Sequence, residues 1–415
     1  MNTLVRIPGA LALVASLVGL GSCGPRPSSS PTALTIPAPA DEAAMTWSSP
    51  IIPLSVRAPS PPPPAMQPIA VTEATRTARL LAGLDAQAQW LDQAEAARLA
   101  RSGARLDDDF AHFGRTVGEP MERWAAEVLE HEDGETIFYP FAGPDFVTAH
   151  RLYPRAGRYV LVAMQKAGPP PPLAELPAED RSTTFELHRQ IVHNFTRLGF
   201  FVTKEMNERY HRELPSAGLT GTLMAFAERE GLAVIDVEPI TLDEQGEVVP
   251  HPGDRARAAT WSSVRLHLRR RADGREVTLD YLRLNLGDWS LRKHEAQRRF
   301  VQLMSGHRTL LKAASHLLQQ RHGFSVVREA LLDNAPSILQ DETGLPYDAL
   351  ARGHDVQLYG EYEAPHRLFD ADPQAPLAEA YAASGDEVQA LPFRIGYRKR
   401  AGSCLQYAVR DASEG

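Results

Sequence analysis

Three carboxylates in two stretches rich in proline and glycine have side chains that could do chemistry. Asp145 lies in YPFAGPDF, residues 139 to 146, while Asp341 and Glu342 lie in LQDETGLPYDAL, residues 339 to 350. If the two stretches meet in space, these carboxylates could work as an acid and base pair or bind a hard cation. Such a site would suit hydrolysis of a polymer.

The same residues also have a structural interpretation. Asp145 would sit in the first turn of a helix running through Val147 and His150, where the helix dipole favours a carboxylate. Residues 341 to 344 would form a turn held by bonds from side chain to backbone, with Pro346 fixing its exit. The sequence leaves both interpretations open.

Other motifs of catalysis or cofactor binding are missing from the chain. Residues 19 to 24 read GLGSCG, but prolines follow directly, so the helix that a dinucleotide loop requires cannot begin there. His188 and His193 are five residues apart and do not share a helix face, and there is no H-E-x-x-H, G-x-S-x-G or Walker sequence. We therefore expect no metal and no cofactor.

The first 23 residues have the plan of a secretory signal peptide. Arg6 precedes an apolar run from Ala10 to Leu20, which is too short to span a bilayer, and small residues lead to Cys23. Leu20 to Cys23 resemble the lipobox of bacterial lipoproteins. That resemblance implies cleavage of residues 1–22, lipid attachment at Cys23 and, because Gly24 is not aspartate, sorting to the outer membrane, facing the periplasm.

The segment after the cysteine differs sharply in composition from the rest. Residues 23–68 are rich in proline and serine, so we expect a disordered linker that cannot bury enough apolar surface to fold. Residues 69–133 should form a helical region and residues 134–415 a mixed α/β body. Cys404 is then the one remaining cysteine, expected to be a buried residue of a strand.

Periodicity of apolar residues predicts the elements of the body. The expected class is α/β or α+β, with packed helices and a mixed, largely antiparallel sheet. Helices are predicted over 84–94, 121–129, 187–198 and across 291–333, and strands over 159–164, 232–237, 264–268, 277–281, 356–359, 393–397 and 404–409, with Asp273 and Gly274 as a hairpin turn.

The charge pattern limits the partners. A net charge of −8 gives no electrostatic case for nucleic acid. Residues 265 to 271 carry four arginines and a histidine, which could bind an anionic envelope polymer or could keep a solvent-facing strand edge soluble.

Four stretches resemble a family of uncharacterised secreted or lipid-anchored bacterial proteins. They are YPFAGPDF, LQDETGLPYDAL, YGEYEAP from residue 359 and LPFRIGY from residue 391. The family motifs read YPFSGPDF and DDSGIPY, so Ala142, Glu342, Thr343 and Leu345 depart from them. The resemblance covers the chain from about residue 137 and implies no activity.

Two functions follow as expectations. The first is a non-enzymatic binding or scaffolding module, held at the membrane by its lipid and meeting an envelope protein or polymer. The second is an envelope hydrolase acting through Asp145, Asp341 and Glu342.

Overall fold

The computed structural model describes residues 69–201, 218–257, 259–366, 374–398 and 403–410. All belong to one compact unit, Pro64–Gly415. The predicted signal peptide, Cys23 and linker lie outside the described residues.

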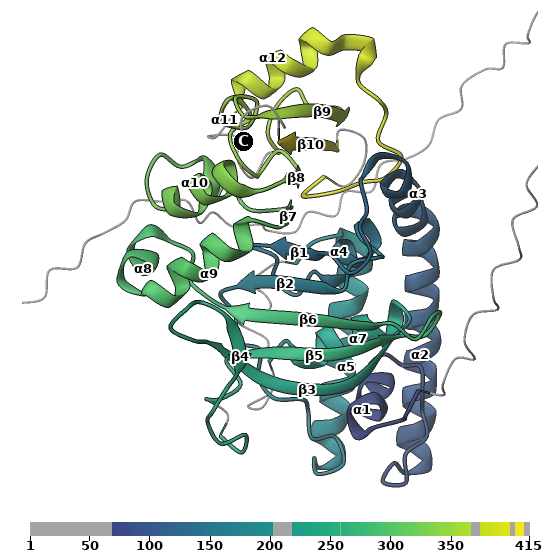
Figure 1. The fold of residues 1–415 in the computed structure, drawn as a ribbon. Coiled ribbons are helices and arrows are strands. Elements are labelled where there is room, and N and C mark those ends of the chain that lie inside the picture. The colour runs from purple at the N-terminus through teal and green to yellow at the C-terminus, as the bar shows by residue number, and fades with distance from the viewer. Residues whose placement is uncertain (1–68, 202–217, 258, 367–373, 399–402, 411–415) are drawn as a thin grey trace, which may run out of the picture. The chain divides into compact units, whose positions relative to one another are not determined.

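Ten strands form a single mixed sheet in the order β4-β3-β5-β6-β2-β1-β7-β8-β10-β9 (Figure 1). Five of its nine strand pairings are antiparallel, which confirms the expected mixed and largely antiparallel sheet. The strands are β1 Thr136–Tyr139, β2 Arg158–Ala163, β3 Leu232–Leu242, β4 Val248–Pro250, β5 Ser263–Arg270, β6 Glu276–Arg283, β7 Arg308–Leu311, β8 Ser337–Gln340, β9 His354–Gly360 and β10 Cys404–Arg410.

The four parallel pairings lie together at the centre, between β6, β2, β1, β7 and β8. Both faces of these strands are buried. In β2, Tyr159 and Leu161 pack into one hydrophobic core, while Val160 and Val162 pack into the other. A continuous apolar run is what a strand covered on both faces requires.

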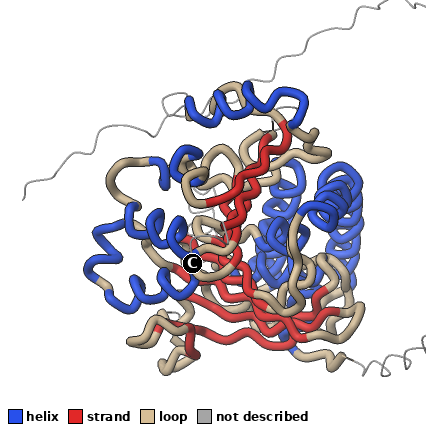
Figure 2. Tube along the Cα trace, turned by 45° about the horizontal axis from the view of Figure 1, so that its top comes forward, coloured by secondary structure: helices blue, strands red, loops and turns tan. Residues whose placement is uncertain are grey.

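Helices cover both faces of the sheet (Figure 2). The core that holds Tyr159 also contains residues of α2 to α5 and α7, and the core that holds Val160 contains residues of α8 to α10. The helices are α1 Glu73–Leu81, α2 Gln93–Phe113, α3 Glu119–Val128, α4 Phe146–Leu152, α5 Ala178–Leu198, α7 Thr220–Arg229, α8 Asp288–Lys293, α9 Glu295–Ser305, α10 Ser325–Asn334, α11 Tyr347–Leu350 and α12 Ala375–Ser384.

The connections change face and direction between β1 and β7. From β1 the chain crosses through α4, on one face, to β2, whereas from β7 it crosses through α10, on the opposite face, to β8. The gap between the carboxyl ends of β1 and β7 is therefore a topological switch point, where open α/β sheets bind their ligands.

Most predicted elements are present. The helices over 121–129 and 187–198 are confirmed, with Gly199 closing the second at a φ of 77°. The strands over 159–164, 232–237, 356–359 and 404–409 and the hairpin of β5 and β6 are also confirmed. Cys404 is a buried, free cysteine, as expected.

Three predictions were wrong. The stretch 84–94 is not one helix, because Asp92 caps α2 through a reciprocal pair of bonds with Glu95 and makes the helix start at Gln93. Residues 393–397 are irregular, with Gly396 at a φ of 67°. The helical region 291–333 is interrupted by β7. In addition, the short strands β1, β4, β7 and β8 had not been predicted.

Candidate functional site

A cavity of about 350 Å³ opens at the switch point. It is lined by residues at or beyond the carboxyl ends of β1, β2, β6 and β7, and it has an aromatic wall to which other segments also contribute. The wall contains Phe141, Phe200, Phe201 and Phe324, and the polar residues that line the cavity are Tyr139, Asp145, Gln165, Asn285, Lys312, Ser315 and Tyr397.

Asp145 is buried at the start of α4 and forms its N-cap. One carboxylate oxygen accepts a hydrogen bond from the Thr148 N–H at 3.3 Å, and the other accepts from the Tyr139 hydroxyl at 3.0 Å and from the Lys312 ammonium. Because Gly143 and Pro144 form the bend before the helix, the carboxylate is directed at the first turn of α4.

Lys312 follows β7 and reaches the same point from the other side of the switch. Its three ammonium protons are used within the protein, on the Asp145 carboxylate, on the Thr148 hydroxyl at 3.0 Å and on the Gly199 carbonyl at 2.6 Å. The side chain is 2% exposed. This lysine therefore joins β7, the start of α4 and the end of α5, and has no proton left for a ligand.

The backbone around the cavity is strained. Within the described residues, the non-glycine positions with positive φ are Phe141 at 63°, Ala313 at 53°, Ser315 at 55° and His316 at 56°. The first three line the cavity and the fourth follows directly. Such conformations persist only where surrounding structure enforces them, and they gather at functional sites.

The two tyrosines of the cavity are held in their neutral form. Burial, followed by the charge of Asp145, raises the pKa of Tyr139 well above its usual range. Burial raises the pKa of Tyr397 to about 12. The Tyr397 hydroxyl bonds the Ala313 carbonyl and the Ser315 hydroxyl, each at 2.8 Å, and so supports the strained segment.

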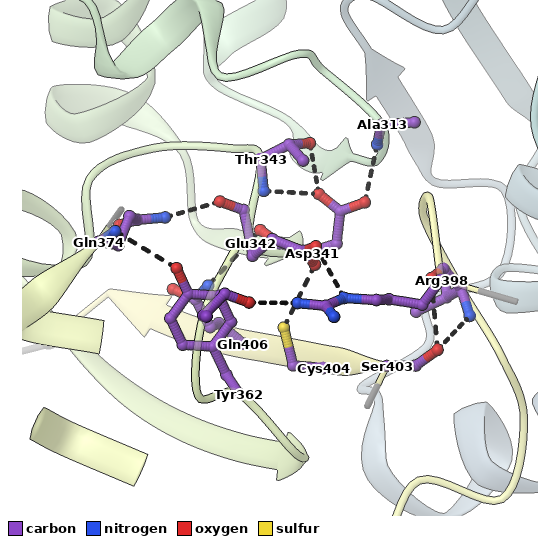
Figure 3. A network of polar contacts seen from close by, with 12 residues as sticks. Ala313, Asp341, Glu342, Thr343, Tyr362, Gln374, Arg398, Ser403, Cys404 and Gln406 are labelled. Carbon is purple, nitrogen blue, oxygen red and sulfur yellow. Dashed lines mark hydrogen bonds and ion pairs between the residues drawn. The ribbon is translucent and has the colours of Figure 1, made fainter. Parts of the chain in front are cut away.

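Asp341 supports the same segment through the backbone of Ala313 (Figure 3). Its carboxylate accepts hydrogen bonds from the Ala313 N–H at 2.8 Å and from the Thr343 N–H at 2.9 Å. Gly396 lies so close that a Cβ there would stand 2.3 Å from an Asp341 oxygen. The carboxylate is fully buried, and burial raises its pKa.

Glu342 is the centre of a second buried group in the same network (Figure 3). Its side-chain oxygens accept from Arg398 Nε at 3.3 Å and from the Cys404 thiol at 3.5 Å, and its carbonyl accepts from the Gln374 amide at 2.7 Å. Burial, followed by the neighbouring Asp341 charge, raises the pKa of Glu342 to about 7.

The two predicted loops, residues 139–146 and 339–350, thus both contact residues 312–315, but they do not line one common cavity. Within residues 312–315, Asp145 accepts from the Lys312 ammonium and Asp341 accepts from the Ala313 N–H. Asp145 lines the cavity, whereas Asp341 and Glu342 are buried behind its wall. Both structural roles expected from the sequence, the start of a helix and a turn closed by side chains, are present.

Lys312, Tyr397 and Gln165 are site residues that sequence reasoning missed. Lys312 directly follows the short strand RTLL, and a single lysine after a largely buried strand was the one available signal. Tyr397 lies in a stretch that was predicted as a strand. Gln165 is the second residue after the end of β2.

Other candidates do not assemble into sites. Among the described residues, no three His, Cys, Asp or Glu side chains gather as ligands of a metal. His188 is buried, with burial lowering its pKa to about 4, and His193 bonds Asp109 at 2.8 Å.

The cationic stretch 265–271 is neutralised by acidic partners, and β5 is an internal strand and not a sheet edge. The pairs are Arg265 with Asp280, His267 with Glu238, Arg269 with Glu276, Arg270 with Asp273, and Arg271 with Glu228.

Comparison of the chain with protein-family models, curated proteins and solved structures finds no match. No helix of the described ranges combines the length and apolarity needed to cross a membrane.

Proposed function

We propose that the protein is a non-enzymatic binding module of the bacterial envelope, whose body holds a small molecule in the cavity at the switch point. The observation that carries the proposal is the position of this cavity. It lies at the carboxyl ends of parallel strands, among strained backbone and aromatic walls, as ligand sites of open α/β sheets do.

The chemistry of the lining favours binding over catalysis. Lys312 has its protons engaged, Asp145 is paired with it, and the pKa values of the two tyrosines are raised. General acid or base catalysis works best with a group whose pKa is near the operating pH. Glu342 has such a pKa but does not line the cavity, so the envelope hydrolase is the weaker alternative.

The envelope location rests on the sequence alone. The lipid expected at Cys23 would hold the body near the outer membrane, facing the periplasm, and the linker to residue 68 would let it reach a protein or polymer partner.

Binding of the uncharged fluorescent dye Nile red tests the proposal. Replacing Ala163, which lines the cavity at the end of β2, by leucine fills part of the space and should weaken dye binding by about tenfold, or about 1.4 kcal/mol. The same change at the exposed Ala383 of α12 is the control. Equal binding by the wild type, Ala163→Leu and Ala383→Leu proteins would place the dye elsewhere and reject the proposal.

The strand order favours a second candidate. The seven strands β6-β2-β1-β7-β8-β10-β9, with β10 alone reversed, have the order of the Rossmann-like methyltransferases. In such enzymes S-adenosylmethionine supplies the methyl group, and here Gln165 and the aromatic wall would hold its nucleoside. This is an analogy of fold, tested by calorimetric titration with S-adenosylmethionine: no heat of binding would remove the candidate.

A further inference from the structure

The start of α4 bears on which ligands the cavity accepts. In dinucleotide-binding folds, the helix after the first strand begins with free N–H groups that bind the pyrophosphate. Here Asp145 fills that position with the protein's own carboxylate, bonded to the Thr148 N–H. The charge of Lys312, which could have attracted a phosphate, is already paired with Asp145.

The loop before the helix also departs from a phosphate loop. Between β1 and α4 the chain reads PFAGPD, in which Gly143 is the one glycine and two prolines lack an N–H. Phe141 directs a bulky side chain to the cavity where a dinucleotide loop would bring bare backbone to the phosphates. A phosphate at this place would meet a carboxylate and an aromatic ring.

The end of β2 offers a different kind of contact. In folds of this type an acidic residue at the end of the second strand binds the hydroxyls of a ribose. This chain has Gln165 there, and Asn285 stands beyond the end of β6 on the same cavity. The Asn285 side-chain oxygen Oδ1 accepts from the Gly287 N–H at 2.9 Å, which orients the side-chain amide. An amide can donate to and accept from a sugar hydroxyl without adding charge.

From these three features we infer that the cavity binds a nucleoside that carries no phosphate, with Gln165 and Asn285 contacting its sugar and the phenylalanines contacting its base. The volume of about 350 Å³ and the flat aromatic walls suit a base with one sugar. The inference rests on the proposed function, since it concerns the same cavity.

Displacement of Nile red by adenosine, AMP and ATP tests the inference. Adenosine should displace the dye at a concentration at least about tenfold lower than AMP, a difference of about 1.4 kcal/mol in binding. Gln165→Ala should weaken adenosine binding about tenfold more than it weakens dye binding, whereas Gln93→Ala, at the exposed start of α2, should change neither.

The variant Asp145→Asn tests why the cavity should prefer adenosine to AMP. Asparagine still caps α4, but it leaves the Lys312 charge without its acid, so AMP should gain affinity relative to adenosine. If AMP or ATP displaces the dye from the wild-type protein at the same concentration as adenosine, the inference is wrong. If Nile red binds in an Ala163-dependent way but adenosine never displaces it, the nucleoside is rejected while the binding module stands. If the dye does not occupy the cavity, the proposed function itself fails.

Discussion

The carboxylate of Asp145 and the ammonium of Lys312 form a buried ion pair across the gap between β1 and β7. The two residues are 167 positions apart, and their side chains are 3% and 2% exposed. The pair links the start of α4 to the residue that follows β7.

Removal of one member of this pair should be costly. Lys312→Met leaves the Asp145 charge buried with only the Tyr139 hydroxyl and the Thr148 N–H, so the free energy of unfolding should fall by about 3–5 kcal/mol. Urea denaturation measures it. The control is Arg76→Gln, which breaks an exposed pair with Glu73 and should cost less than about 1 kcal/mol. Similar losses of unfolding free energy in both variants would mean that the buried pair contributes no more to stability than the exposed pair.

Stability should depend on pH through Glu342. Its pKa is raised from 4.5 to about 7 in the folded protein, so the folded state holds the proton more tightly than the unfolded state. The free energy of unfolding should therefore fall by about 3 kcal/mol as the pH rises from 4.5 to 7. Glu342→Gln, always neutral, should lose this part of the pH dependence.

The groups facing Glu342 define the control for that measurement. The carboxyl of Glu342 is contacted or faced by Asp341, Arg398 and Cys404, and the pKa of Asp341 is raised as well. The quantity to compare is therefore the difference in the pH dependence of unfolding free energy between the wild type and Glu342→Gln. Glu379→Gln, on the exposed side of α12, should keep the wild-type slope. A Glu342→Gln protein with an unchanged slope would contradict the raised pKa.

Gly396 should not tolerate a side chain. Alanine there would adopt a φ of 67° and place its Cβ 2.3 Å from an Asp341 oxygen. Gly134 also has a positive φ, of 81°, but a Cβ there meets nothing within 4 Å. Gly134→Ala should cost about 1–2 kcal/mol from backbone strain alone, and Gly396→Ala about 1–3 kcal/mol more from the clash. Thermal unfolding of the two variants measures this difference. Equal unfolding midpoints would contradict the close contact between Gly396 and the Asp341 carboxylate.

Elements with clear periodicity could be predicted from the sequence. The α5 stripe ending at Gly199 and the alternating β5 and β6 are examples, because each is long enough to repeat its pattern several times. The strands that build the site were missed. β1, β7 and β8 have four residues each, TIFY, RTLL and SILQ, too few for a period, and they become strands through pairing with distant neighbours.

The candidate site was predictable only in part, for the same reason. Proline, glycine and aspartate in sequence indicated a helix start at Asp145, since capping is a local property. The partner of Asp145 was not predictable, because Lys312 reaches it through the order of the strands. The relation of Asp341 to the cavity also depends on that order, since it acts through Ala313 at the end of a neighbouring strand.

The central claim is that the switch-point cavity binds a small molecule, and methyl NMR of the methionines tests it most directly. Met164 lines the cavity and is 57% exposed, whereas Met121, Met224 and Met304 are buried away from its lining. On addition of Nile red or adenosine, the account predicts that the Met164 methyl signal shifts with saturation while the other three stay in place. A saturable shift confined to Met121, Met224 or Met304, with Met164 unchanged, would contradict the account.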